Sequence, residues 1–155
     1  MPVEIERKYL LRNDDWKLLA DSGTKYVQGY MVGSKLASVR VRLEGDKSFL
    51  NIKSATLDIQ RQEYEYQIPV EEATEMLDNL CEKPFVEKTR YIVMHQDLKW
   101  EIDVFEGMNK GLIVAEVELE TEDQKIELPS WCGQEVSEDA RYYNVNLGKQ
   151  PFLEW

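Results

Sequence analysis

The stretch VEIERKYLL at residues 3–11 alternates between apolar and charged side chains. One set of alternate positions holds Val3, Ile5, Tyr9 and Leu11, and the other holds Glu4, Glu6, Lys8 and Leu10. Because successive side chains of a strand point to opposite faces of a sheet, this stretch predicts a strand with one apolar face and one charged face.

The same period of two returns along the whole chain. Seven further segments show it, at 26–31, 39–43, 50–53, 63–68, 88–93, 100–104 and 115–120. The residues EGD at 44–46 predict a hairpin turn between two of these strands. Apolar residues at helical spacing predict a helix over 71–82, and Asn13, Thr121 and Ser137 are typical caps of shorter helical pieces. Runs of strands with short helices between them indicate an α+β protein with a largely antiparallel sheet.

The charged positions of these strands come in pairs of like sign, two residues apart. The pairs are Glu4/Glu6, Arg40/Arg42, Glu63/Glu65, Lys88/Arg90, Glu101/Asp103 and Glu116/Glu118. Members of a pair share a face and repel each other, whereas a face selected only for solubility mixes its signs. For any single strand, an open sheet with its charged face in water is the alternative. Taken together, the pairs favour an eight-stranded antiparallel closed β-barrel, a tunnel with a charged interior flanked by a few short helices.

Length and composition limit the classes of function. A chain of 155 residues suits one domain, which we place over residues 1–155. Its 19 basic and 30 acidic residues give a net charge of −11, which nucleic-acid phosphates repel. One histidine and two cysteines argue against a zinc centre and against Ser-His or Cys-His catalysis. Because we find neither an apolar run long enough for a membrane nor a signal peptide, we expect a cytoplasmic protein with no nucleic-acid or membrane partner, and a homodimer on base rates.

The two signs of charge on the inner face predict two kinds of ligand. Eight carboxylates oppose six cations there, and buried charges are costly unless they are paired or ligated. The acidic surplus predicts Mg²⁺ or Mn²⁺, which prefer carboxylate oxygens and substrate phosphates. The arginines and lysines predict a polyanion, since a guanidinium matches phosphate oxygens in a bidentate manner. Phosphoryl transfer needs positioning, charge neutralisation and an oriented water, so it requires no covalent nucleophile.

The residues EIERKYL at 4–10 contain the pattern Glu-x-Glu-x-Lys, which resembles the signature of the CYTH superfamily, the triphosphate tunnel metalloenzymes. The later segments keep the order of that family: QGY at 28–30, VRVRL at 39–43, IKS at 52–54, RQEYEY at 61–66, VEKTRY at 86–91, EIDVF at 101–105, VAEVELE at 114–120 and EDARYYN at 138–144. The resemblance covers nearly the whole chain and is strongest to the small bacterial inorganic triphosphatases.

The resemblance implies a role for each matching position. The metal-binding positions of the family match Glu4, Glu6, Glu116 and Glu118, with Glu63 and Asp103 as additional ligands. The substrate-binding positions match Lys8, Arg40, Arg42, Lys53, Lys88 and Arg90, and Arg141 is expected to close one mouth of the tunnel. Lys8 and Tyr30 match a pair that activates water, with Lys8 as the base, its pKa lowered by neighbouring cations and metal, and Tyr30 as its positioner. Metal-bound water is the alternative to Lys8.

The implied activity is metal-dependent hydrolysis of a phosphoanhydride bond of inorganic triphosphate, which yields pyrophosphate and phosphate. Alternative activities are hydrolysis of an organic triphosphate, such as thiamine triphosphate or a nucleoside triphosphate, and cyclisation of ATP as in class IV adenylate cyclases. A polyphosphate-binding module without turnover is the alternative outside enzymes. Structural alternatives also remain for single residues: Lys8 neutralises Glu4 or Glu6, Tyr30 packs at a strand end, and Glu65 and Glu101 neutralise tunnel arginines.

Overall fold

A computed structural model describes residues 3–55 and 59–155 of the chain. The strands in this part are β1 Val3–Leu11, β2 Thr24–Gly33, β3 Ala37–Glu44, β4 Lys47–Ser54, β5 Gln60–Gln67, β6 Val86–His95, β7 Leu98–Phe105, β8 Ile113–Glu118 and β9 Cys132–Glu135. The helices are α1 Val70–Leu80 and α2 Asn144–Lys149, with 3₁₀ helices at Asp15–Leu18, Gly107–Asn109, Ala140–Tyr142 and Phe152–Glu154. None of these described helices is long and apolar enough to cross a membrane.

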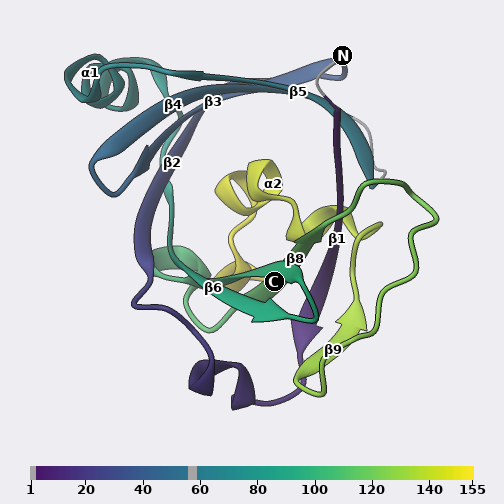
Figure 1. Cartoon of the computed structure of the whole chain (residues 1–155). Helices are drawn as coiled ribbons and strands as arrows, with labels where there is room; N and C mark the ends of the chain where they lie inside the picture. The colour runs from purple at the N-terminus through teal and green to yellow at the C-terminus, as the bar shows by residue number, and fades with distance from the viewer. Residues whose placement is uncertain (1–2, 56–58) are drawn as a thin grey trace.

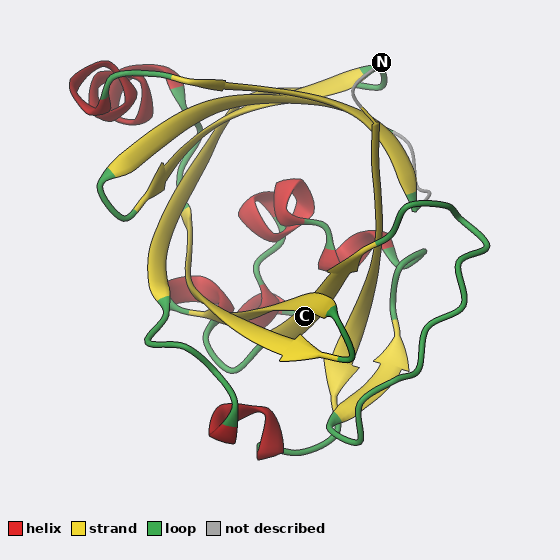
Figure 2. Cartoon of the chain, viewed as in Figure 1, coloured by secondary structure: helices red, strands yellow, loops and turns green. Residues whose placement is uncertain are grey.

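Eight strands close into an antiparallel barrel (Figures 1 and 2). The strand order is β5-β4-β3-β2-β6-β7-β8-β1, and β1 completes the ring by pairing with β5 through Val3, Glu4 and Ile5. The short strand β9 pairs with the later part of β1, where Leu11 lies opposite Cys132, and stays outside the closed ring. The predicted eight-stranded antiparallel barrel with a few short helices is therefore confirmed.

The outer face of β2, β3 and β4 is covered by α1. Ala73 and Leu77 of this helix are buried together with Val41 of β3. Gly29 of β2 permits the close approach, because a Cβ atom there would lie 2.7 Å from Leu77 Cδ2 and 2.9 Å from Cys81 Cβ. The apolar positions of these strands therefore face outward under the helix, which leaves the alternate positions for the interior.

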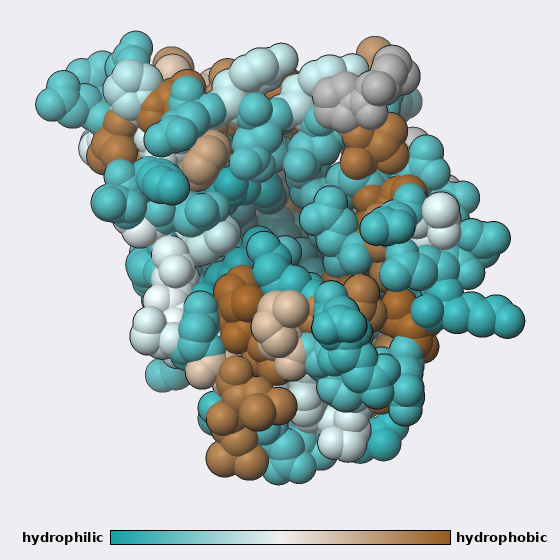
Figure 3. All heavy atoms as spheres, viewed as in Figure 1, coloured by the Kyte–Doolittle hydropathy of each residue, from teal (hydrophilic) through white to brown (hydrophobic). Residues whose placement is uncertain are grey.

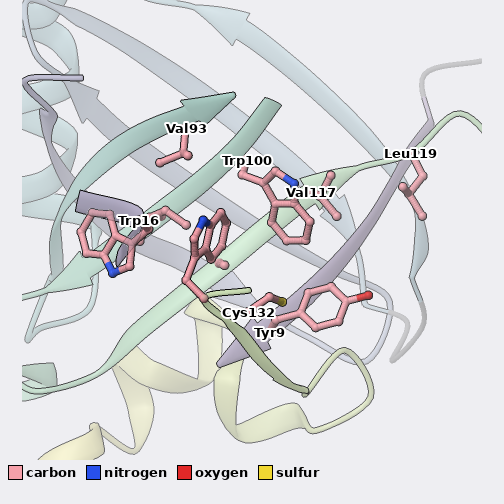
Figure 4. Close-up of a cluster of buried hydrophobic side chains, with 10 residues drawn as sticks. Tyr9, Trp16, Val93, Trp100, Val117, Leu119 and Cys132 are labelled. Atoms are coloured by element: carbon pink, nitrogen blue, oxygen red, sulfur yellow. The ribbon is translucent and has the colours of Figure 1, made fainter. Parts of the chain in front are cut away.

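A second apolar cluster covers the outer face of β1, β6, β7 and β8 (Figure 4). Trp100 of β7 lies at its centre, with ring centroids 5.6 Å from Tyr9 and 5.4 Å from Trp131. Trp16, in the 3₁₀ helix that follows β1, and Cys132, at the start of β9, extend the cluster. Because the aromatic core lies outside the ring of strands, the inside of the ring is free for polar side chains.

The short helices and turns agree with the sequence only in part. The EGD turn joins β3 to β4, with Gly45 at φ +61° in the region that favours glycine. The segment after Asn13 forms only the 3₁₀ helix Asp15–Leu18, and the segment after Thr121 forms turns without a helix. Asp139, rather than Ser137, caps the 3₁₀ helix that contains Arg141. The strand β9 was not predicted, because its four residues show no clear alternation.

Candidate active site

The barrel encloses a cavity of about 290 Å³, and every strand of the ring contributes to its lining. The lining residues are Glu4, Glu6, Tyr26, Arg40, Arg42, Glu44, Lys53, Glu63, Glu65, Lys88, Arg90, Lys99, Glu101, Glu116, Glu118 and Asn144. Figure 3 shows the hollow on one face of the molecule, with hydrophilic residues around it. The like-charge pairs of the sequence therefore converge on a shared interior.

The carboxylates of β1 and β8 face each other in the barrel wall. Glu6 lies directly opposite Glu118 in the register of the two strands. Burial and the negative charges of Glu4 and Glu6 together raise the pKa of Glu118 above its ordinary value. Negative charge is therefore in excess between β1 and β8. Carboxylate oxygens such as these are the ligands that Mg²⁺ and Mn²⁺ prefer.

The same acidic side chains are paired with cations. Lys53 Nζ donates to both carboxylate oxygens of Glu4, at 3.0 and 3.1 Å, and lies 3.3 Å from Glu63. Arg61 lies 3.5 Å from Glu4 and 3.7 Å from Glu6. Over residues 3–55 and 59–155, no group of three or more acidic, histidine or cysteine side chains is arranged to hold a metal ion. The donors fit a hard divalent cation by their chemistry, but that cation must take the place of lysine and arginine partners.

Lys8 is buried between two carboxylates. Its Nζ donates to Glu116 Oε1 at 2.6 Å and to Glu6 Oε1 at 3.2 Å, and its backbone N–H donates to Ser137 Oγ at 3.0 Å. Burial acts to lower the pKa of Lys8, but the charges of Glu116 and Glu6 outweigh burial and raise it. Between these two carboxylates the pKa shift is opposite to the one expected for an amine beside cations and metal, and the role of Lys8 as base stays a prediction.

A second group of ion pairs connects β6 and β7. Lys88 Nζ donates to Asp103 Oδ2 at 2.7 Å, while Arg90 donates through Nε and Nη2 to the two oxygens of Asp103 at 2.7 and 2.9 Å. Arg90 Nη1 also donates to Glu101 Oε2 at 2.6 Å, so Glu101 does neutralise a tunnel arginine. Burial lowers the pKa of Lys88 to about 8 in spite of Asp103. The amine with the lowered pKa is therefore Lys88 and not Lys8.

The wall formed by β3 offers two guanidinium groups whose Nε donors have no partner. Arg42 is 3.1 Å from Glu44 and 3.3 Å from Glu65, and its guanidinium lies 4.9 Å from the centre of the Phe49 ring. Among the described residues, Arg40 forms no ion pair with a carboxylate, and the Nε atoms of Arg40 and Arg42 are buried without a hydrogen-bond partner. Buried donors without an acceptor are costly, so this wall is suited to an anion.

Four predicted site residues do not line the main cavity. Lys8 and Asp103 are buried in the ion pairs described above, and Tyr30 and Arg141 lie elsewhere. Tyr30 lies opposite Arg40 in the register of β2 and β3 and lines a narrow adjoining space of about 20 Å³. Arg141 is not brought to the tunnel: it donates to Asp139 Oδ2 at 2.7 Å, and its guanidinium lies 5.0 Å from the centre of the Trp155 ring. The prediction that Arg141 closes a mouth of the tunnel is corrected accordingly, because these partners hold its guanidinium at an exposed surface.

Several residues of the site were not predicted. Arg61 has the same alternation as Glu63 and Glu65, and that signal could have assigned it to the interior. Asn51 lies opposite Glu65 on β4 and donates to it through Nδ2 at 3.1 Å. Asn144 enters the cavity from α2, where no strand alternation can mark it.

The comparisons with known proteins agree with this geometry. A family model described as CYTH domain matches residues 2–147. An inorganic triphosphatase of Acetivibrio thermocellus is 47% identical over 152 residues, which cover 98% of this chain and 97% of the relative. An inorganic triphosphatase of Nitrosomonas europaea is 40% identical over 150 residues, with 94% and 96% covered. A crystal structure of an inorganic triphosphatase superposes with a TM-score of 0.66 at 37% identity, over 96% of this chain and 95% of that one. The chain therefore belongs to the CYTH domain family.

Proposed function

We propose that this protein hydrolyses inorganic triphosphate to pyrophosphate and phosphate with Mg²⁺ or Mn²⁺ as cofactor. The composition of the cavity carries the proposal, because eight glutamates and six lysines or arginines line a space of about 290 Å³. That volume lies at the small end of ligand pockets, which span roughly 300–1,000 Å³. Relatives that match over nearly their full length are inorganic triphosphatases, which agrees with this choice.

Organic triphosphates fit this cavity less well. Thiamine triphosphate, a nucleoside triphosphate and the ATP of a cyclase reaction each bring a ring system that needs an apolar or hydrogen-bonding pocket. Among the described lining residues, Tyr26 is the one aromatic or apolar side chain. Its ring already lies 4.9 Å from the Arg90 guanidinium and 5.6 Å from that of Arg42. Inorganic triphosphate has no ring system and therefore needs no such pocket.

In the proposed complex the cations of several walls bind the phosphoryl groups. Arg40 and Arg42 offer unpaired N–H groups from β3, and Lys53, Lys88 and Arg90 add charge from β4 and β6. The metal would be held by carboxylates of three strands, Glu4, Glu6, Glu63, Glu116 and Glu118. When bound, it supplies neutralisation of charge on the phosphate oxygens. Asp103 is left out of the ligand set, since it is fully buried beneath Lys88 and Arg90.

Lys8 and Tyr30 remain the proposed pair that assists the attack of water. In the structure Lys8 is kept protonated by Glu6 and Glu116, so it gains basicity only when these carboxylates are engaged by another cation. Tyr30 lies opposite Arg40, which lines both spaces, and itself lines the narrow space. The expectations of a cytoplasmic location and of a homodimer stay predictions.

The test is phosphate release from inorganic triphosphate, ATP and thiamine triphosphate, each with Mg²⁺ or Mn²⁺ and each with a chelator. Inorganic triphosphate should turn over fastest, and the chelator should abolish turnover. Glu4→Ala should also abolish it, whereas Glu75→Ala, on the exposed face of α1, should not. Preferential cyclisation of ATP, or tight binding of triphosphate without any hydrolysis, would overturn the proposal.

A further inference from the structure

The dipeptide Tyr143–Asn144, at the start of α2, lies between opposite walls of the tunnel. The Tyr143 ring lies 5.8 Å from Lys8 Nζ of β1 and 5.0 Å from the Arg61 guanidinium of β5. Asn144 Oδ1 accepts from Lys88 Nζ of β6 at 3.2 Å and from Gln28 Nε2 of β2 at 3.3 Å. Two consecutive residues thus contact four strands of the ring. We call this dipeptide the floor of the tunnel.

The floor is fixed by contacts outside the tunnel. The Tyr143 hydroxyl donates to the backbone oxygen of Ser137 at 2.8 Å, and the Tyr143 side chain is buried. Leu147, in the next turn of α2, is fully buried in an apolar cluster with Val86 and Phe105. Figure 1 shows α2 within the outline of the ring of strands. Displacing the floor therefore requires pulling a buried leucine out of its cluster.

The space available for a ligand changes abruptly at the floor. Asn144 lines the main cavity of about 290 Å³ and also the narrow space of about 20 Å³, which Tyr30, Ser38 and Val145 help to bound. The narrow space is of the order of a single water, which needs roughly 10–15 Å³. A phosphoryl group does not fit there unless the floor moves.

Cations lie at the level where the space narrows. Arg40 and Lys53 line both spaces, and Lys88 is hydrogen-bonded to the floor itself. The amide oxygen of Gln28, also beside Asn144, is buried without a hydrogen-bond partner. The last phosphoryl group of a linear chain that enters from the wide side is therefore held by cations but has no room to advance.

We propose that Tyr143 and Asn144 limit the length of the polyphosphate chain that the tunnel accepts. This inference rests on the proposed function, since it specifies which polyphosphates the same site takes. Chains short enough to end at the floor bind with every phosphoryl group beside a cation. A longer chain exceeds the space that the floor leaves between these cations and the open end of the cavity.

The test compares inorganic triphosphate with inorganic tetraphosphate. Asn144→Ala removes the side chain of the floor, and Leu147→Ala loosens α2 without altering a lining residue of the main cavity. Asn146→Ala is the matched control, because this asparagine lies in the same helix and donates to the backbone oxygen of Ala140. We expect kcat/KM for tetraphosphate relative to triphosphate to rise at least about tenfold in the first two variants. The control should keep the wild-type ratio.

A second measurement separates the floor from the chemistry. Calorimetric titration of both polyphosphates in the presence of a chelator gives their dissociation constants without turnover. The ratio of these two constants is compared between the variants and wild type. A wild type that binds triphosphate with the chelator but does not cleave it with Mg²⁺ or Mn²⁺ contradicts the proposed function, whereas the binding ratio still tests the floor. The floor hypothesis is overturned by a folded Asn144→Ala variant whose two ratios stay within about twofold of wild type. Thermal unfolding establishes that each variant is folded.

Discussion

Replacing Glu116 by glutamine should weaken the fold as well as the activity. Glu116 Oε1 accepts from Lys8 Nζ at 2.6 Å, and Oε2 lies 3.6 Å from Arg90 Nη2. The side chains of Glu116 and Lys8 are only 8% and 5% exposed, so the pair is buried. Removing one partner of a buried ion pair costs about 3–5 kcal/mol of unfolding free energy.

The structure places the loss at the lower end of that range. Lys8 keeps Glu6 at 3.2 Å, and Arg90 keeps Asp103 and Glu101 at 2.7 and 2.6 Å. We therefore expect a loss of about 3 kcal/mol in the variant Glu116→Gln. At roughly 2–4 °C per kcal/mol for a domain of this size, the melting temperature falls by about 6–12 °C.

Glu118→Gln is the matched variant, two residues further along β8. Burial and repulsion from Glu4 and Glu6 raise the pKa of Glu118, so a neutral amide relieves strain at pH 7 instead of creating it. Its melting temperature should equal or exceed that of wild type, although both variants should lose turnover as proposed metal ligands. Thermal unfolding with a chelator at neutral pH compares the two. Equal stability of Glu116→Gln and wild type would refute the role of Glu116 as the counter-charge of Lys8.

Four further predictions follow from the same contacts. Arg40→Ala should raise KM for triphosphate at least about tenfold, with a smaller effect on kcat, because it removes binding by a guanidinium that has no carboxylate partner among the described residues; an unchanged KM contradicts its assignment. Lys8→Ala should lower kcat by a larger factor than it changes KM, and steady-state kinetics that show only a higher KM would assign Lys8 to binding. Gly29→Ala should cost about 1–3 kcal/mol, measured by urea unfolding, because its Cβ atom would lie 2.7 Å from Leu77 Cδ2. Stability should also fall on acidification. The cationic partners of Glu116 outweigh its burial and lower its pKa. The stabilisation that Glu116 provides is therefore present above its unfolded-state pKa of about 4.3 and is lost as the pH drops through its folded-state pKa. Urea midpoints that do not decrease between neutral and acidic pH would contradict this sign.

The alternation of the sequence predicted the barrel because successive side chains of a strand point to opposite faces of the sheet. Arg40 and Arg42 both face the interior for this reason, with Val41 buried on the other side beneath α1. Like charge within each pair then indicated a shared cavity, since two adjacent guanidinium groups are stable only where anions meet them. The interior was thus predictable without any knowledge of the tertiary contacts.

The parts that the sequence did not predict depend on contacts between distant segments. The direction of the Lys8 pKa shift is set by Glu116, which is 108 residues away in the chain. Tyr143 immediately precedes α2 and Asn144 begins it, so neither lies on a strand whose period of two could mark it. The resemblance assigns Arg141 to the tunnel. In the structure its guanidinium donates to Asp139, two residues earlier, and the sequence alone does not reveal this contact.

The pairing of the tunnel walls makes substrate binding an exchange of partners. A phosphoryl oxygen that accepts from Lys53 or Arg90 withdraws a hydrogen bond from Glu4 or Glu101. These carboxylates then lie beside a polyanion without the full charge of their cationic partners. Leaving a buried charge without its partner costs several kcal/mol. A divalent cation held by the same carboxylates removes that cost, so triphosphate and metal should each strengthen the binding of the other by the same factor. This reciprocal coupling explains how a cavity with more glutamates than cations can accept a chain of phosphates.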